Sequence, residues 1–176
     1  MKTSLFSILT LILMSLTSCS TTGDIPKTVR EVNLQKYAGK WYEIAKFPNS
    51  FQKNCFCSTA EYTLTDKGYV KVFNACRKGD LNGKISSVTG KAFPVAGTNN
   101  TKLRVQFFWP FRADYWVVGL ADDYSWAAVS EPSRKYLWIL GRSPQMDETT
   151  YNQIQLMLRN NGFDLSPLEK TLQTCE

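Results

Sequence analysis

The chain has 176 residues, of which 43% are hydrophobic and 13% aromatic, so it is long enough for one domain with its own core. It carries a net charge of +6 at pH 7, but its lysines and arginines are scattered with no run of four, which argues against nucleic-acid binding. The absence of histidine excludes Ser-His-Asp and Cys-His catalytic pairs and histidine-ligated zinc or haem. No metal or other cofactor is expected.

Residues 1–18 have the organisation of a secretion signal. Lys2 supplies a positive start, the stretch from Leu5 to Leu16 is mostly apolar, and the small residues Thr17 and Ser18 follow. A buried helix is the alternative, but the position, length and flanks favour a signal peptide. The run is also too short for a comfortable membrane span.

The residues around Cys19 point to a lipid anchor. Leu16-Thr17-Ser18-Cys19 resembles the cleavage box of bacterial lipoproteins, in which the cysteine becomes an N-terminus carrying fatty acyl chains such as palmitate. Ser20, rather than Asp, follows the cysteine, which in those proteins points to the outer membrane. The resemblance implies an outer-membrane lipoprotein whose domain faces the periplasm. Residues 19–31 are polar and aperiodic, which is typical of a tether, so the folded domain should span residues 32–176.

The next hundred residues contain eight β-like segments separated by turn signals. The clearest is 102–108, where Leu103, Val105 and Phe107 alternate with polar residues and share one face. The predicted strands are 41–47, 56–65, 69–75, 85–93, 102–108, 115–120, 125–131 and 136–141. Eight antiparallel strands with hairpin-length connections favour an all-β, up-and-down barrel that can hold one small ligand, although a two-sheet sandwich is the alternative.

One α-helix is expected after the last strand. Asp147 is a good N-cap and Gly162 can end the helix. Tyr151, Ile154 and Leu158 fall on one face, so the helix should pack against the outside of the barrel.

Three short motifs in this order resemble the lipocalin family. They are Gly39-Lys40-Trp41 at the first strand, Asp122-Asp123-Tyr124 in the turn between strands six and seven, and Arg142 after the last strand. The resemblance covers residues 32–176 and implies a lipocalin barrel. It also implies that Gly39, Trp41, Asp123, Tyr124 and Arg142 close the base of the barrel, with Arg142 lying over the indole of Trp41, and take no part in chemistry.

Two further segments narrow the resemblance to the lipocalins that include apolipoprotein D and the bacterial outer-membrane proteins. These segments are Trp41-Tyr42-Glu43-Ile44-Ala45 and Tyr136-Leu137-Trp138-Ile139-Leu140. The resemblance implies a protein that carries or scavenges fatty acids or lysophospholipids and is not an enzyme. A lipid-modifying lipocalin enzyme and a structural envelope lipoprotein with a filled barrel are the alternatives.

Strand alternation then predicts which side chains line a ligand site. If Trp41 faces the interior, Glu43, Ala45 and Phe47 should follow it there, and Arg142 similarly places Leu140, Trp138 and Tyr136 inside. Tyr62 and Phe73 are further wall candidates. The predicted ligand-binding residues are therefore Glu43, Phe47, Tyr62, Phe73, Tyr136, Trp138 and Leu140. The Glu43 carboxylate should bind either a ligand head group or a Tyr or Arg near the base.

Four cysteines remain once Cys19 is assigned to the lipid, which suits two disulfides. Pairing strands two and three around their turn places Cys57 nominally opposite Cys76. The lipocalin resemblance implies a different pairing, because Cys57 matches the apolipoprotein D cysteine that bonds the C-terminal tail. It implies Cys57–Cys175 and Cys55–Cys76.

The segment Phe107-Phe108-Trp109-Pro110-Phe111 is unusually aromatic for a connection between strands. Counting connections from the Trp41 end places it at the open mouth of a barrel. Three interpretations remain: a ligand portal, a membrane contact, or packing into the rim.

Overall fold

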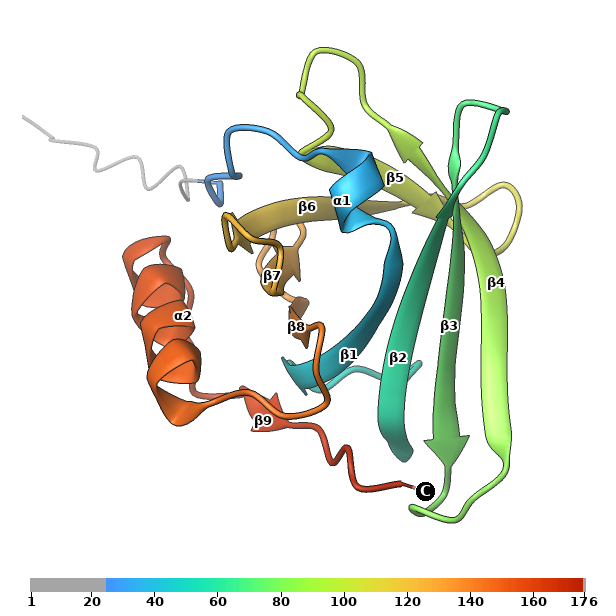
Figure 1. Cartoon of the computed structure of the whole chain (residues 1–176), viewed down its shortest axis with the longest axis vertical. Helices are drawn as coiled ribbons and strands as arrows, with labels where there is room; N and C mark the ends of the chain where they lie inside the picture. Colours follow the sequence, from blue (N-terminus) through green and yellow to red (C-terminus); the bar gives the residue numbers. More distant parts are fainter. Residues whose placement is uncertain (1–24, 176) are drawn as a thin grey trace, which may run out of the picture.

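The computed structural model describes residues 25–175 (Figure 1). The predicted signal peptide, Cys19 and the first part of the predicted tether lie outside these residues. The described elements in chain order are α1 (Leu34–Tyr37), β1 (Gly39–Lys46), β2 (Cys55–Leu64), β3 (Val70–Lys78), β4 (Ile85–Pro94), β5 (Lys102–Gln106), β6 (Ala113–Leu120), β7 (Trp126–Ser130), β8 (Leu137–Gly141), α2 (Glu148–Asn160) and β9 (Glu169–Lys170).

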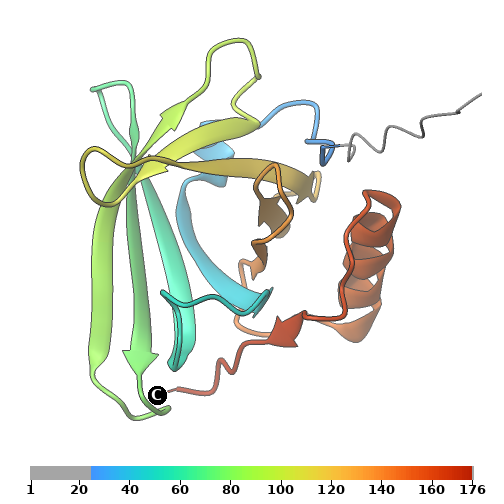
Figure 2. The same ribbon diagram turned by 180° about the vertical axis from the view of Figure 1, so that it is seen from behind.

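The strands form a closed antiparallel barrel. Their order in the sheet is β2-β3-β4-β5-β6-β7-β8-β1-β9, and an additional pairing of β1 with β2 closes the first eight strands into a ring. The short β9 lies outside that ring and pairs with the end of β1. The closed barrel is the predicted architecture, and the sandwich alternative is wrong. Seen from behind, α2 lies on the side of the molecule away from β2, β3 and β4 (Figure 2).

Helix α2 begins and packs as its sequence predicts. The Asp147 side chain accepts a hydrogen bond from the Thr150 backbone N–H at 2.9 Å and so caps the first turn. Tyr151, Ile154 and Leu158 are buried against the barrel. A Cβ atom added at Gly119 on β6 would lie 2.4 Å from the Met157 Cε atom, so this glycine lets the helix approach the strand closely.

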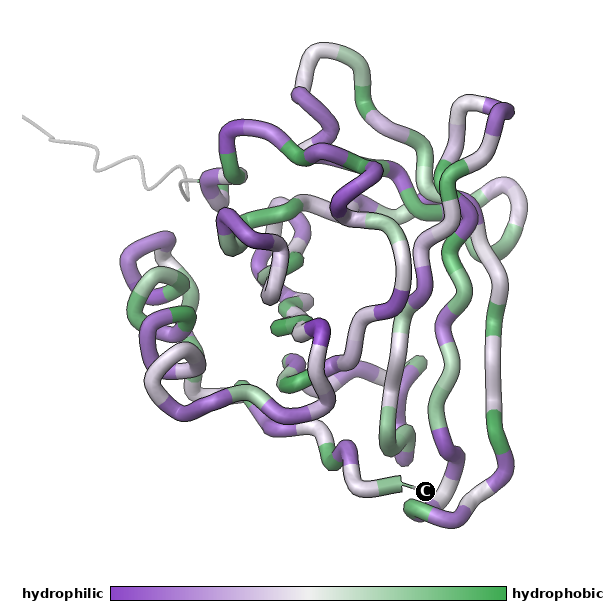
Figure 3. The backbone as a smooth tube through the Cα atoms, in the orientation of Figure 1, coloured by the Kyte–Doolittle hydropathy of each residue, from purple (hydrophilic) through white to green (hydrophobic). Residues whose placement is uncertain are grey.

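The hydrophobic residues form two clusters on opposite sides of the barrel wall. The interior cluster lies inside the barrel and comprises the buried residues Val32, Tyr37, Trp41, Tyr62, Val70, Val72, Ala92, Leu103, Val105, Val117, Ala127, Val129 and Leu140. The helix cluster lies between the wall and α2 and comprises Ile44, Ala45, Phe47, Trp116, Val118, Ala128, Leu137, Ile139, Tyr151, Ile154, Leu158, Phe163 and Leu165. Alternating hydrophilic and hydrophobic residues are visible along β2, β3 and β4 (Figure 3).

A β-bulge in β1 decides which side chains reach the interior. Glu43 lies opposite Leu140, but Ala45 lies opposite Ile139, so Ile44 is an extra residue in β1. The extra residue reverses the alternation, and Ala45 and Phe47 therefore face α2. The prediction that these two residues line the interior is wrong for this reason.

Residues 25–31, which belong to the predicted tether, lie along the barrel. Val29 donates its backbone N–H to the Val117 carbonyl at 3.0 Å, and Lys27 donates its own to the Asn161 side chain at 2.8 Å. The domain thus begins a few residues earlier than the sequence pattern indicates.

Candidate ligand-binding interior

One end of the barrel is sealed by Trp41 and Arg142. Trp41 has no exposed surface, and its indole Nε1–H donates to the Tyr37 carbonyl at 2.8 Å. The guanidinium carbon of Arg142 lies 3.7 Å from the centroid of this indole. Arg142 also donates to the carbonyls of Lys40 at 2.9 Å and Lys36 at 2.7 Å. This cation–π contact and the fork of hydrogen bonds hold α1 and β1 together at the base.

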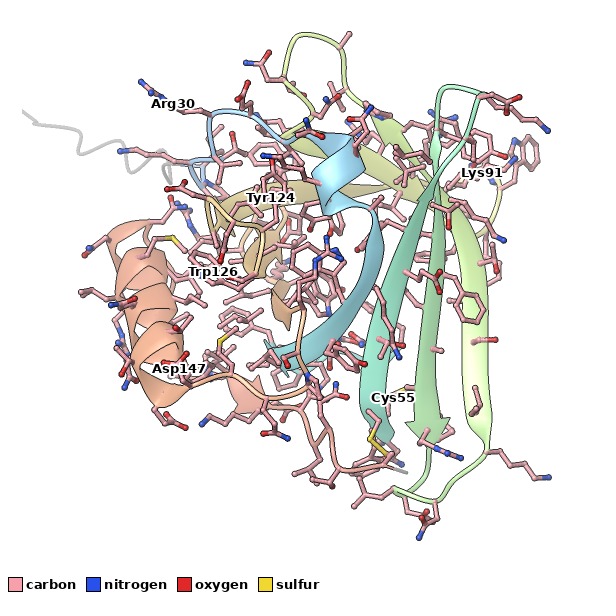
Figure 4. The ribbon with its side chains drawn as sticks, in the orientation of Figure 1. Arg30, Cys55, Lys91, Tyr124, Trp126 and Asp147 are labelled. Carbon is pink, nitrogen blue, oxygen red and sulfur yellow. A yellow bond between two sulfur atoms is a disulfide. The ribbon has the colours of Figure 1, made fainter. Side chains whose placement is uncertain are left out.

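The turn between β6 and β7 supports the same end. The Tyr124 hydroxyl accepts a hydrogen bond from the Asn33 backbone N–H at 2.9 Å, which ties the turn to α1 (Figure 4). The Asp123 carboxylate accepts from the Ser125 backbone N–H at 3.0 Å, and hydrogen bonds from Ser125 lower the pKa of Asp123. Gly39 has a φ of 94°, and a Cβ atom there would lie 3.4 Å from the guanidinium of Arg142.

Three tyrosine hydroxyls meet inside the barrel above this base. The Tyr115 hydroxyl lies 2.7 Å from that of Tyr37 and 2.8 Å from that of Tyr62. Burial raises the pKa of all three, that of Tyr62 to about 12, so the hydroxyls remain protonated at neutral pH. Tyr62 was predicted to line the wall. Tyr37 and Tyr115 are interior residues that the sequence pattern did not predict, although Tyr115 alternates with the interior Val117 and could have been identified on that basis.

The wall nearest to β8 matches the prediction from alternation. Leu140 belongs to the interior cluster and Trp138 packs against it, opposite Val129 of β7. Phe107, which directly follows β5, also packs against the interior cluster. A Cβ atom added at Gly90 would lie 2.7 Å from the Phe107 ring. Glycine at position 90 therefore makes room for the Phe107 ring.

Glu43 is buried on the interior side, because it lies opposite Leu140, and only 4% of it is exposed. Its carboxylate accepts hydrogen bonds from the Thr171 hydroxyl at 2.6 Å and the Gln52 amide at 2.6 Å. Burial raises the pKa of Glu43, and these two hydrogen bonds partly oppose the rise. Gln52 in turn accepts from the Trp138 indole at 2.8 Å. The partners of the Glu43 carboxylate thus come from the β1–β2 connection and the C-terminal segment, and neither is the Tyr or Arg expected from the sequence.

Two other residues predicted to line the interior, Phe73 and Tyr136, do not lie in the interior wall. Phe73 alternates with the interior residues Val70 and Val72, so its side chain points outward and is 38% exposed. Its prediction as a wall residue is wrong because it rested on no parity anchor. Tyr136 precedes β8 and is 37% exposed, with its ring stacked on Trp138 at 5.9 Å. It thus lies at the rim.

Two buried polar atoms of the described residues have no hydrogen-bond partner, the Oγ of Ser58 and the Oδ1 of Asn74. Asn74 lies opposite Ala60, which packs against the interior cluster, so the Asn74 side chain faces the interior. Ser58 lies in the irregular stretch of β2 between Phe56 and Thr59. Buried polar atoms without protein partners are rare and are usually satisfied by water or a ligand.

Both disulfides have the pairing that the lipocalin resemblance implies. Cys55 bonds Cys76 between β2 and β3, and Cys57 bonds Cys175 across a separation of 118 residues. The nominal register of Cys57 with Cys76 is broken because β2 has a bulge between Phe56 and Thr59. Cys57 has a φ of 50° within that bulge.

The described residues contain neither a metal-binding cluster nor a helix that could span a membrane. No group of three or more Cys, Asp or Glu side chains between residues 25 and 175 is arranged to hold a metal ion. Neither α1 nor α2 is long and apolar enough to cross a membrane.

Comparison with known proteins identifies the family. Residues 32–173 match the model of the lipocalin-like domain. The chain is 39% identical to temperature-induced lipocalin-1 of Arabidopsis thaliana over 156 residues, which is 84% of this chain and 83% of that protein. It is 35% identical to outer membrane lipoprotein Blc of Escherichia coli strain K12 over 144 residues, 80% of this chain and 81% of that protein. It is also 35% identical to bovine apolipoprotein D over 157 residues, with 84% and 80% covered.

Solved structures agree on the fold. Insecticyanin of the tobacco hornworm Manduca sexta superposes with a TM-score of 0.68 at 23% identity, covering 84% of both chains. The matched domain, the relatives and the barrel with its sealed base lead to one conclusion: the chain belongs to the lipocalin family.

Proposed function

We propose that this lipocalin binds one small apolar ligand inside its barrel and carries or scavenges it in the cell envelope. The observation that carries the proposal is the difference between the two ends of the barrel interior. Trp41 and Arg142 seal one end, while the wall continues through Leu140 and Trp138 toward the other. A ligand would therefore enter at the end opposite Trp41.

A fatty acid or lysophospholipid fits the chemistry of this interior. Its acyl chain would contact the apolar wall, and each buried CH₂ group contributes about 0.8 kcal/mol before ordering costs. The partnerless Oδ1 of Asn74 and the tyrosine hydroxyls supply a few polar contacts inside the wall. Such a lining, mostly apolar with few polar groups, is typical of small-molecule sites.

The role is binding rather than catalysis. Cys55, Cys57, Cys76 and Cys175 are all in disulfides, so none of them can act as a thiolate nucleophile. With no histidine in the chain, the usual general bases for such a nucleophile are also missing.

The proposed location is the outer membrane, with the barrel in the periplasm. Removal of residues 1–18 would leave Cys19 as an acylated N-terminus a few residues before the domain. The relatives named outer membrane lipoprotein Blc in Escherichia coli and Vibrio cholerae support this placement.

Tryptophan fluorescence tests the ligand. Adding palmitic acid or a lysophospholipid to delipidated protein should change the emission, because Trp138 lies in the interior wall. Trp138→Phe should remove most of the change. Trp126→Phe is the matched control, since Trp126 packs in the helix cluster and should leave the signal intact.

The binding should be saturable and should strengthen with acyl chain length. If folded, delipidated protein binds no acyl ligand, the carrier function is wrong and a structural lipoprotein with a filled barrel replaces it.

A further inference from the structure

The connection between β5 and β6 presents three aromatic side chains to solvent. Phe108 is 72% exposed, Trp109 is 86% exposed and Phe111 is 77% exposed, whereas the preceding Phe107 packs into the barrel. Packing into the rim, one of the three interpretations of this segment, is therefore wrong for these three residues. Such a concentration of exposed aromatic surface on one loop indicates an interaction site.

Positive side chains flank both ends of the loop. Lys91 lies opposite Gln106, where β5 ends and the loop begins, and it is exposed (Figure 4). Arg112 directly follows Phe111 and is also exposed. Lys71 lies opposite Lys91 on the outer face of β3, so a third cation adjoins the same surface.

The contacts of the cations around this loop leave its surface with a positive charge. The Lys91 ammonium lies 5.0 Å from the centroid of the Tyr69 ring, and the Arg112 guanidinium carbon lies 4.2 Å from that of Phe93. Arg104 is the nearby cation with an acidic partner, because its guanidinium contacts Asp114 at 3.0 Å. Aromatic neighbours hold a cation in place without neutralising it.

The chemistry of this surface matches a lipid bilayer better than a protein partner. Trp side chains favour the headgroup region of a membrane, where one side of the ring is apolar and the other is wet. Lysines and arginines beside them bind anionic lipids. Protein interfaces, by contrast, are depleted in lysine.

We propose that Phe108, Trp109 and Phe111 insert into the headgroup region of an anionic bilayer, while Lys71, Lys91 and Arg112 bind its charged surface. The contact does not require the acyl group proposed for Cys19. In an up-and-down barrel the β5–β6 connection belongs to the end opposite Gly39 and Trp41. Docking therefore places the end proposed for ligand entry beside the lipid phase.

Vesicle binding tests this surface without the lipid anchor. Residues 20–176 are suitable, because both hydrophobic clusters and the residues packed against them lie between positions 29 and 168. The protein should float with vesicles of phosphatidylcholine and phosphatidylglycerol and much less with phosphatidylcholine alone. Its emission should shift to the blue and be quenched by nitroxide-labelled lipids, and Trp109→Phe should remove both effects.

Variants separate the apolar and the charged parts of the contact. The triple substitution F108S/W109S/F111S should weaken vesicle binding at least about tenfold. Lys71→Gln and Lys91→Gln should each weaken binding to the anionic vesicles about fivefold. The control L156S/L172S, which alters exposed apolar residues elsewhere, should bind as the unsubstituted protein does.

Equal urea midpoints would show that the triple variant is folded. Absence of binding to anionic vesicles, or binding that the triple substitution leaves unchanged, would overturn the proposal. Self-association that the same substitution abolishes, without vesicle binding, would assign the surface to a second copy of the chain. Each of these results is independent of whether the barrel binds palmitic acid.

Discussion

At the scale of single residues, the partly buried Arg142 and the buried Glu43 differ in how their surroundings stabilise a charge. Arg142 is held by the Trp41 ring and by carbonyls of α1 and β1, so its charge is well compensated. Glu43 has only neutral hydrogen-bond donors, and burial raises its pKa. Arg142 should therefore stabilise the protein at every accessible pH, whereas the contribution of Glu43 should depend on pH.

Arg142→Lys should destabilise the protein by about 2–3 kcal/mol, because a lysine keeps the charge but loses the planar fork of donors and its stacking on the indole. Urea unfolding measures the difference. Arg159→Lys on the exposed side of α2 is the matched control and should have little effect. Near-equal stabilities of Arg142→Lys and the unsubstituted protein would contradict the role assigned to Arg142.

Glu43 should lower stability as its carboxyl ionises. Because its pKa is higher in the folded than in the unfolded protein, its contribution is fully present below the unfolded value of about 4.5 and is lost as the pH rises through the folded pKa. Glu43→Gln should therefore gain stability relative to the unsubstituted protein between acid and neutral pH. Urea unfolding at an acid pH and at neutral pH measures this gain. Glu61→Gln, at an exposed position, is the control. A difference that is independent of pH would refute the expectation.

At the scale of elements, the C-terminal segment fills a gap between β1 and β2. The two strands pair only as far as Tyr42 and Thr59. Beyond that point Thr171 donates its N–H to Ile44, Cys57 donates its N–H to Leu172, and the Gln173 amide donates to the carbonyls of Glu43 and Ser58. The segment thus takes the place of the missing strand pairing, and the Cys57–Cys175 disulfide fixes its end.

The two disulfides should differ in their contribution to stability. The Cys57–Cys175 bond spans 118 residues and should contribute about 4–5 kcal/mol in the chain-entropy model, while Cys55–Cys76 spans 21 residues and should contribute about 3 kcal/mol. Paired serine substitutions avoid free thiols, and urea unfolding compares the two losses. A larger loss for C55S/C76S than for C57S/C175S would contradict this order.

At the scale of the whole molecule, the hydrophobic core of the barrel comes later in the sequence than the position proposed for the lipid anchor. Both clusters draw on residues between 29 and 168, so a substitution at Cys19 should leave the fold unchanged.

Cys19→Ala should abolish incorporation of labelled palmitate in bacterial cells, because no other cysteine lies in the predicted cleavage box. Ser20→Ala should remain labelled and serves as the control. Labelling that persists in Cys19→Ala would mean that the acyl group is attached elsewhere.

The amino-acid sequence by itself determined the fold class, the base of the barrel and the interior position of residues with a reliable anchor. Period-two alternation needs only local information, so Trp138 and Leu140 could be placed from Arg142. The motifs at Trp41, Tyr124 and Arg142 carried the family, and the disulfide pairing followed from that resemblance rather than from strand register.

Only the tertiary structure decided the features that depend on bulges and on distant segments. One extra residue at Ile44 turned Phe47 toward α2, and such a bulge leaves no local sequence signal. The partners of Glu43 come from Gln52 and Thr171, the latter 128 residues away in sequence. The exposed loop residues Phe108, Trp109 and Phe111 also depend on the tertiary structure, because they follow the end of β5. That end is set by the register in which β5 pairs with β4 and β6.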